Sequence, residues 1–160
     1  MKILGSMAWK KTLEILDRIE FFNAFSIEEK EMLATFHGRF YSTQSNETII
    51  KEGDSIDTLF VLLSGQVNVY KGRSKESLAV LTPGDIFGEI SFITKTQRIS
   101  SVVASEPCIV LEIDHAMLTV LNAEIREKIK DQIIIKLVKR LDLMNARLYD
   151  ISQKSDRPIF

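Results

Sequence analysis

The stretch "LTPGDIFGEISFITKTQRISSVVA", residues 81–104, places a short helical segment inside a region of strands. Pro83-Gly84-Asp85 has the composition of a tight turn, and the valine-rich segment after Arg98 has the composition of a strand. Between them, Ile90 and Ile93 lie three residues apart after Gly88, which is helical spacing. The start of such a helix exposes backbone N–H groups, so this stretch predicts a place where an anion can bind.

Short strand-like segments continue on both sides of this stretch, from residue 38 to residue 114. The segments rich in Val, Ile, Phe and Tyr are RFYST, ETIIKEG, TLFVLLSG, QVNVYKG, SLAVL, ISSVVAS and CIVLEID. Turn residues separate them at Glu52-Gly53-Asp54, Ser64-Gly65 and 71–74. This spacing predicts about seven or eight strands in an antiparallel sandwich or barrel.

Helical periodicity flanks the strand region on both sides. Apolar residues recur at helical steps from Trp9 to Ile19, a turn is expected at Phe21-Phe22, and Ser26 with Glu29 has capping-box spacing. The C-terminal stripe comprises Leu118, Leu121, Ile125, Ile129, Ile133, Leu137, Leu141, Met144, Leu148 and Ile151. We therefore expect a single domain over residues 7–151, with N-terminal helices in 7–36, a β-roll in 38–114 and C-terminal helices in 115–151.

The last helix, of about 25 residues, carries more apolar surface than one contact needs. Ile134, Val138 and Leu143 lie beside the main stripe, which predicts two covered sides. One side would pack on the sandwich, and a second copy of the chain is the simplest cover for the other. The outer part of the stripe is therefore either core or the seam of a homodimer.

Composition narrows the possible functions. The 160 residues are 45% apolar with a formal net charge of −1, which gives no general attraction to nucleic acid or anionic lipid. One cysteine, Cys108, and two histidines are too few for a zinc site, an iron–sulfur cluster or a disulfide framework. No apolar run approaches the ~20 residues of a membrane helix. We expect a cytoplasmic, non-membrane protein with no metal site, no cofactor and no catalytic residues.

Two charged residues in the opening stretch point to a ligand. Arg98 follows Glu89 by nine residues, and its planar guanidinium matches the oxygens of a phosphate. Glu89 would repel a phosphate but accepts hydrogen bonds from sugar hydroxyls. Together they suggest a receptor for a sugar phosphate. In the alternative interpretation, Arg98 is a surface arginine paired with Glu89 or Asp85, and Glu89 only caps a helix.

The motif "FGEISF…QRISSV" resembles the phosphate-binding cassette of the cyclic nucleotide-binding domains, of the catabolite activator protein and cyclic-AMP-dependent kinase regulatory subunit type. The resemblance covers Trp9 to about Ile151. It implies a jelly-roll with N-terminal helices, a short phosphate-binding helix and a long C-terminal helix. It also implies a stand-alone regulatory domain, not an enzyme, that binds cyclic AMP or cyclic GMP.

Carried over by position, the resemblance implies contacts with each part of the ligand. Glu89 would hold the ribose 2′-hydroxyl with the backbone of Gly88 and Ile90, and Arg98 would hold the phosphate with the amides of Ile99 and Ser100. Val69 and Leu78 would wall the base, with Met144 and Asn145 over it. The implied ligand-binding set is Phe87, Gly88, Glu89, Ile90, Ser91, Arg98, Ile99, Ser100, Val69, Leu78, Met144 and Asn145. Because Ile99 lacks the hydroxyl that cyclic-GMP-binding members use there, the resemblance favours cyclic AMP.

The leading hypothesis is a cyclic-nucleotide sensor that signals through its C-terminal helix, as a homodimer or on an effector protein in trans. One alternative is an interaction domain of the same fold that binds no nucleotide. Another is the sensor half of a transcription regulator, although residues 152–160 are too few for a helix-turn-helix, so we expect no DNA-binding domain and no direct DNA binding. A metal-dependent barrel enzyme would need histidine ligands on the strands, and His37 and His115 lie outside them.

Overall fold

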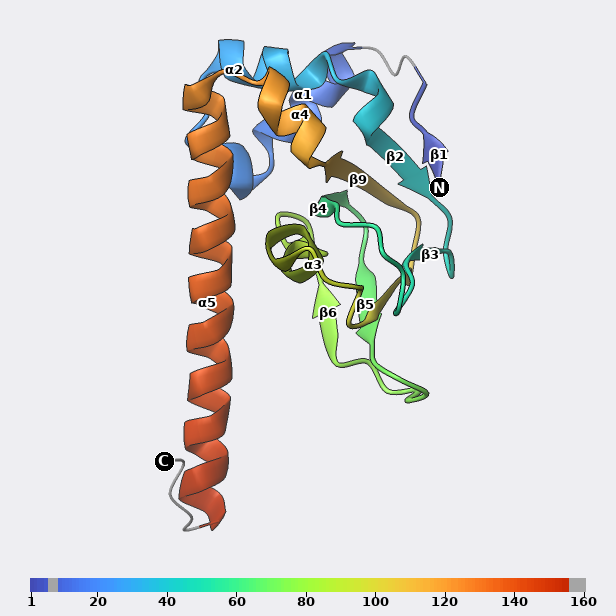
Figure 1. The fold of residues 1–160 in the computed structure, drawn as a ribbon, viewed down its shortest axis with the longest axis vertical. Coiled ribbons are helices and arrows are strands. Elements are labelled where there is room, and N and C mark those ends of the chain that lie inside the picture. The colour runs from blue at the N-terminus through green and yellow to red at the C-terminus, as the bar shows by residue number, and fades with distance from the viewer. Residues whose placement is uncertain (6–8, 156–160) are drawn as a thin grey trace.

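Two antiparallel sheets form the centre of the protein in the computed structural model, which describes residues 1–5 and 9–155 (Figure 1). The first sheet has the order β1 (Lys2–Ile3), β2 (Phe40–Thr43), β9 (Cys108–Ile113), β4 (Leu59–Ser64), β7 (Ile86–Phe87). The second has the order β3 (Thr48–Ile50), β8 (Ser101–Ala104), β5 (Val67–Tyr70), β6 (Ala79–Leu81). The predicted antiparallel β-roll is confirmed, with eight strands between residues 38 and 114. Strand β1, which pairs with β2, was not predicted.

Strand β4 is continuously apolar in sequence, and both of its faces are buried. Leu59, Val61 and Leu63 pack against the helices, in the larger of two buried clusters. Phe60 and Leu62 point to the other face of the sheet and belong to the cluster between the two sheets. Since neither face of β4 meets water, the strand lacks the alternation of a half-buried strand.

The N-terminal helices cover one end of the first sheet. They are α1 (Trp9–Asp17), the 3₁₀ helix η1 (Glu20–Phe22), α2 (Ile27–Ala34) and η2 (His37–Arg39). The capping box of α2 is present: Glu29 N–H donates to Ser26 Oγ, and Ser26 N–H donates to Glu29 Oε1. The turn expected at Phe21 and Phe22 is η1, and both rings are fully buried. The expected start at residue 7 lies outside the described residues.

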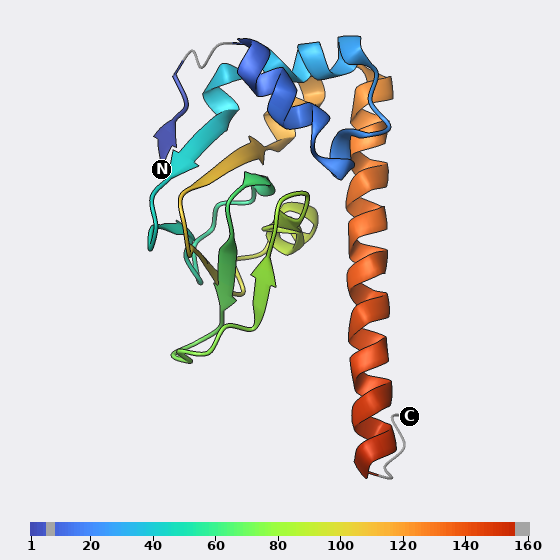
Figure 2. The same ribbon diagram turned by 180° about the vertical axis from the view of Figure 1, so that it is seen from behind.

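The C-terminal helices are α4 (His115–Val120) and α5 (Ala123–Ser155). At 33 residues, α5 is longer than predicted. Its first half packs on the body through Ile125, Ile129 and Ile133, all buried. In both views its second half runs clear of the β-roll (Figures 1 and 2), and Leu141 and Leu148 are exposed there. The apolar stripe is therefore core over its first half only. In the described part of the chain, no helix is long and apolar enough to cross a membrane.

Candidate functional site

The cassette forms as predicted, with helix α3 (Glu89–Thr94) directly after β7. Gly88 caps α3 with a φ of 78°, in the left-handed region that favours glycine. A Cβ at this position would lie 2.7 Å from Nη1 of Arg98 and 2.8 Å from the carbonyl oxygen of Thr58. Gly88 is therefore required both by its backbone angle and by the close approach of the arginine.

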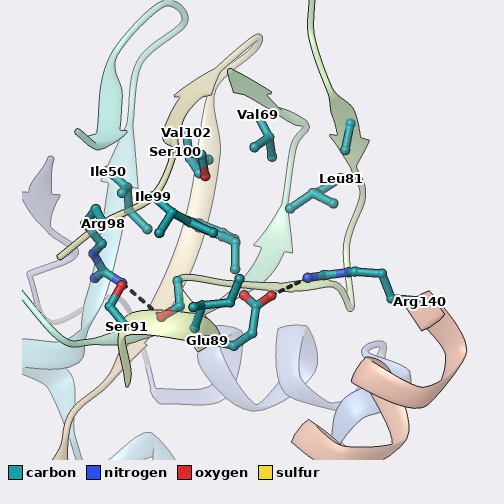
Figure 3. Close-up of a pocket in the computed structure, with 14 residues that line it drawn as sticks. Ile50, Val69, Leu81, Glu89, Ser91, Arg98, Ile99, Ser100, Val102 and Arg140 are labelled. Atoms are coloured by element: carbon teal, nitrogen blue, oxygen red, sulfur yellow. Dashed lines mark hydrogen bonds and ion pairs between the residues drawn. The ribbon is translucent and has the colours of Figure 1, made fainter. Parts of the chain in front are cut away.

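A pocket of about 190 Å³ opens between α3, the second sheet and one side chain of α5 (Figure 3). Nine of the predicted residues line it: Val69, Phe87, Gly88, Glu89, Ile90, Ser91, Arg98, Ile99 and Ser100. The other lining residues are Ile50, Ala79, Leu81, Val102 and Arg140. One wall is thus apolar and comes from strands β3, β5, β6 and β8, while the opposite wall carries the polar groups of the cassette.

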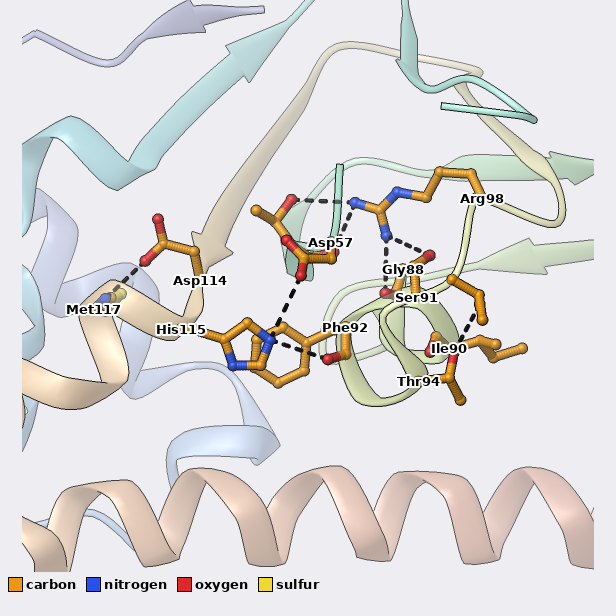
Figure 4. Close-up of polar contacts among 12 residues, drawn as sticks. Asp57, Gly88, Ile90, Ser91, Phe92, Thr94, Arg98, Asp114, His115 and Met117 are labelled. Carbon is orange, nitrogen blue, oxygen red and sulfur yellow. Dashed lines mark hydrogen bonds and ion pairs between the residues drawn. The ribbon is translucent and has the colours of Figure 1, made fainter. Parts of the chain in front are cut away.

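Arg98 lies at the polar wall and is only 5% exposed. Its Nη1 donates to the carbonyl oxygen of Gly88 at 2.9 Å and to Oγ of Ser91 at 3.2 Å. Its Nη2 donates to the carbonyl oxygen and the hydroxyl of Thr58, at 2.7 and 3.1 Å. Figure 4 shows the contacts of Arg98 with Gly88 and Ser91. Four neutral acceptors therefore hold the guanidinium.

Within residues 1–5 and 9–155, the charge of Arg98 has no direct counter-ion. Among the described residues no carboxylate forms an ion pair with it, because Glu89 pairs with Arg140 and Asp85 lies near Lys136. Burial lowers the pKa of the Arg98 guanidinium. The carboxylates of Asp57, Glu112, Asp54 and Glu89, which form no ion pair with it, raise this pKa. An arginine remains charged even so. The interpretation of Arg98 as a surface arginine paired with Glu89 or Asp85 is wrong.

Glu89 is also buried, with 6% of its surface exposed. Its Oε1 accepts a hydrogen bond from Nη1 of Arg140 at 2.5 Å, and Nη2 of Arg140 donates to the carbonyl oxygen of Ile86 at 2.8 Å. Figure 3 shows Arg140 reaching from α5 to this carboxylate at the edge of the pocket. A residue of the predicted sugar site is thus joined directly to the C-terminal helix.

Three predicted residues lie away from the pocket. Leu78 precedes β6 and is exposed; Ala79 and Leu81 face the pocket instead, because alternate residues of a strand point the same way. Met144 and Asn145 are exposed on the second half of α5.

Sequence reasoning placed the contribution of α5 about one turn too far along the helix, and it missed Arg140. The tandem of Lys139 and Arg140 was the only signal for this residue, and nothing in the sequence shows which of the two faces the pocket.

Comparison with known proteins agrees with this geometry. A family model described as "Cyclic nucleotide-binding domain" matches residues 42–123, just over half of the chain. The chain belongs to the cyclic nucleotide-binding domain family. The match contains the whole β-roll from β3 onward, the cassette and α4, so the residues that form the pocket, apart from Arg140, lie inside it. The domain is related to regulators that bind cyclic AMP or cyclic GMP.

The most informative relatives are regulatory proteins. The chain is 33% identical over 89 residues to the cyclic AMP receptor protein of Thermus thermophilus. This aligned region covers 53% of this chain and 40% of that protein. It is 41% identical over 58 residues to a cAMP-dependent protein kinase regulatory subunit of Colletotrichum orbiculare, covering 36% of this chain and 15% of the subunit. The chain thus spans less than half the length of either relative.

Among solved structures, a cyclic nucleotide-binding domain from Methylobacillus flagellatus superposes with a TM-score of 0.61 at 30% identity. The superposition covers 91% of this chain and 81% of that one. The likeness therefore includes the N-terminal helices and much of α5, which lie outside the residues matched by the family model.

Proposed function

We propose that the pocket binds cyclic AMP in preference to cyclic GMP and that the domain is a sensor, not an enzyme. The observation that carries this proposal is Arg98, a buried cation at the pocket wall that has only neutral partners. Because a buried charge without a counter-ion is costly, an anionic ligand at this wall is favoured. Glu89 lies on the same wall with its carboxylate able to accept from ribose hydroxyls, and the apolar wall opposite suits a base.

Isothermal titration of ligand-free protein with cyclic AMP and with cyclic GMP tests the proposal directly. We expect heat with both and tighter binding of cyclic AMP, because Ile99 at the pocket offers no hydroxyl to the guanine amino group. No heat with either nucleotide would contradict the proposal and favour an interaction domain with the same fold. Tighter binding of cyclic GMP would contradict only the base preference.

We further propose that ligand binding is relayed to α5 through Glu89 and Arg140. The part of α5 from Lys128 to Arg140 is tied to the body by a row of ion pairs: Lys128–Glu29, Lys136–Asp85, Lys139–Glu20 and Arg140–Glu89. Of these acids only Glu89 lines the pocket. When a ribose hydroxyl donates a hydrogen bond to Glu89, the bond between Glu89 and Arg140 changes. The population of α5 positions then shifts with it.

Replacing Arg140 by glutamine should uncouple the helix from the pocket. In the wild type we expect cyclic AMP to change the distance between spin labels on α5 and on the β5–β6 loop, and in R140Q we expect that change to be largely lost. Arg147→Gln is the matched control, because Arg147 lies on the exposed half of the same helix and does not line the pocket. A full ligand response in R140Q would show that the relay runs elsewhere.

The second half of α5 is proposed to pair with a second copy of the chain. Leu137, Leu141, Met144, Leu148 and Ile151 alternate in steps of four and three, which is the spacing of a coiled-coil seam. All but the half-buried Leu137 are exposed. Identical stripes fit one another, and since this half of α5 runs clear of the β-roll, two copies meet without moving the roll (Figure 2).

Replacing Leu148 by aspartate should convert this dimer to a monomer, because a charge in the seam has no partner there. Light scattering with and without cyclic AMP measures the mass. Tyr149→Asp makes the same chemical change at the next position, outside the seam, and should leave the dimer intact. A wild-type chain that scatters as a monomer under all conditions would contradict the pairing and leave an effector protein in trans as the partner of α5.

The cytoplasmic location remains a prediction.

A further inference from the structure

Thr58 holds Arg98 from outside the pocket. It lies directly before β4, is 7% exposed and does not line the pocket formed by α3 and the second sheet. Nη2 of Arg98 donates one hydrogen bond to the backbone oxygen of Thr58 and another to its hydroxyl. Figure 4 shows Gly88 and Ser91 together on one side of the guanidinium. One residue therefore supplies both acceptors of one guanidinium nitrogen.

The other terminal nitrogen has different partners. Nη1 donates to Gly88 and to Ser91, and both of these residues line the pocket. The bond to the Ser91 hydroxyl is the longest of the four, at 3.2 Å. A change of the Ser91 χ1 rotamer moves its Oγ away and releases an N–H of Arg98 to a phosphate oxygen. The guanidinium thus has an exchangeable side at the pocket and a fixed side at Thr58.

From this asymmetry we propose that Thr58 is a positioning residue whose hydroxyl sets the plane of the Arg98 guanidinium for phosphate binding. When Ser91 turns away, Gly88 and the backbone oxygen of Thr58 keep one bond to each terminal nitrogen, and the Thr58 hydroxyl adds a further bond to Nη2 that limits tilting of the guanidinium plane. With the plane set, Nη1 is presented to the pocket before the ligand arrives, which lowers the entropic cost of binding. The inference rests on the proposed function, since it assigns Arg98 to the phosphate.

Replacing Thr58 by valine tests the proposal, because valine keeps the shape and the backbone oxygen but removes the hydroxyl. We expect the affinity for cyclic AMP to fall by about fivefold to tenfold, less than the loss of a direct hydrogen bond to a charged group, because Thr58 acts on the ligand only through Arg98. Binding of adenosine, which lacks the phosphate, should be unchanged relative to wild type. Thr58→Ser keeps the hydroxyl and should retain most of the affinity, which guards against a general loss of structure in T58V.

Thr43→Val is the matched control. Thr43 is also buried, at 4% exposure in β2, and its hydroxyl makes no hydrogen bond to Arg98. A second measurement needs no ligand: the side-chain N–H resonances of Arg98 should be separate in the wild type, because four bonds slow the rotation of the guanidinium. They should exchange faster in T58V, where three of the four bonds remain, than in T43V and T58S.

The outcomes separate this inference from the proposed function. Cyclic AMP affinity in T58V that is no lower than in T43V, or an equal loss for cyclic AMP and adenosine, would overturn the role of Thr58 while leaving the proposed function intact. Absence of cyclic AMP binding in the wild type would overturn the proposed function. In that case Arg98 resonances that exchange no faster in T58V than in T43V would still reject the hold by Thr58, and faster exchange would support it.

Discussion

Cyclic AMP should bind roughly tenfold or more weakly after replacement of Arg98 by alanine, the loss of at least one charge-assisted hydrogen bond. The wild-type guanidinium is the cation at the pocket wall, and no described carboxylate neutralises it by ion pairing. Isothermal titration measures the affinity. An unchanged affinity would show that the phosphate lies elsewhere in the molecule.

Two further variants separate binding from folding. Arg98→Ala leaves the carbonyl oxygen of Thr58 without the donor that Arg98 supplies, whereas the Gly88 oxygen still accepts from Phe92 N–H, so we expect a loss of stability of about 1–3 kcal/mol in thermal denaturation. Arg98→Lys keeps the positive charge but cannot reach both residues with a planar fork, and should bind better than R98A yet below wild type. Arg73→Ala removes an exposed arginine from the β5–β6 loop and should change neither quantity.

Replacing Gly88 by alanine should disrupt the cassette more than any other small substitution there. The backbone angle of 78° costs a non-glycine residue about 1–3 kcal/mol, and a Cβ placed 2.7 Å from Arg98 Nη1 adds a further cost of similar size from overpacking. Because the Cβ would press directly on Arg98 and Thr58, the arginine must move. We expect a lower midpoint of chemical unfolding together with a loss of cyclic AMP binding.

Gly72→Ala separates the effect of the backbone angle from the effect of the close contact between a Cβ and Arg98. Gly72 also has a positive φ, 62°, but a Cβ there would meet nothing within 4 Å. It should therefore lose some stability through its backbone and retain the wild-type affinity. If G88A bound cyclic AMP as well as G72A does, the close approach of Arg98 to Gly88 would have no part in the site.

Local chemistry explains why the fold and most of the cassette were predictable. The capping box at Ser26 and the short helix after Gly88 depend on residues close together in the chain, so their patterns are visible in the sequence. Glu89 and Arg98 were found for the same reason, as were the neighbours of each in the pocket wall. The strand pattern from residue 38 to 114 predicted the antiparallel roll because each turn needs particular residues.

The predicted residues that lie away from the pocket depend on contacts between distant segments. Whether Leu78 or Ala79 faces the pocket depends on the register of β6 against β5, where Val69 pairs with Ala79. The packing of α5 on the body likewise decides which of its side chains reaches the pocket. Arg140 lines the pocket, whereas Met144 and Asn145 are exposed farther along the helix. A helix turn is about 5.4 Å, so a small change in how α5 packs selects a different side chain.

The amino-acid sequence thus accounts for the antiparallel roll, for the cassette that follows Gly88, and for the pair of charges that suits a sugar phosphate. Tertiary structure alone assigned the partners of those charges. Thr58 lies 40 residues before Arg98, and Arg140 lies 51 residues after Glu89, so no local pattern connects them. Their contacts exist because packing of β4 and α5 brings distant polar groups to a buried site, where every charge must find an acceptor or a donor.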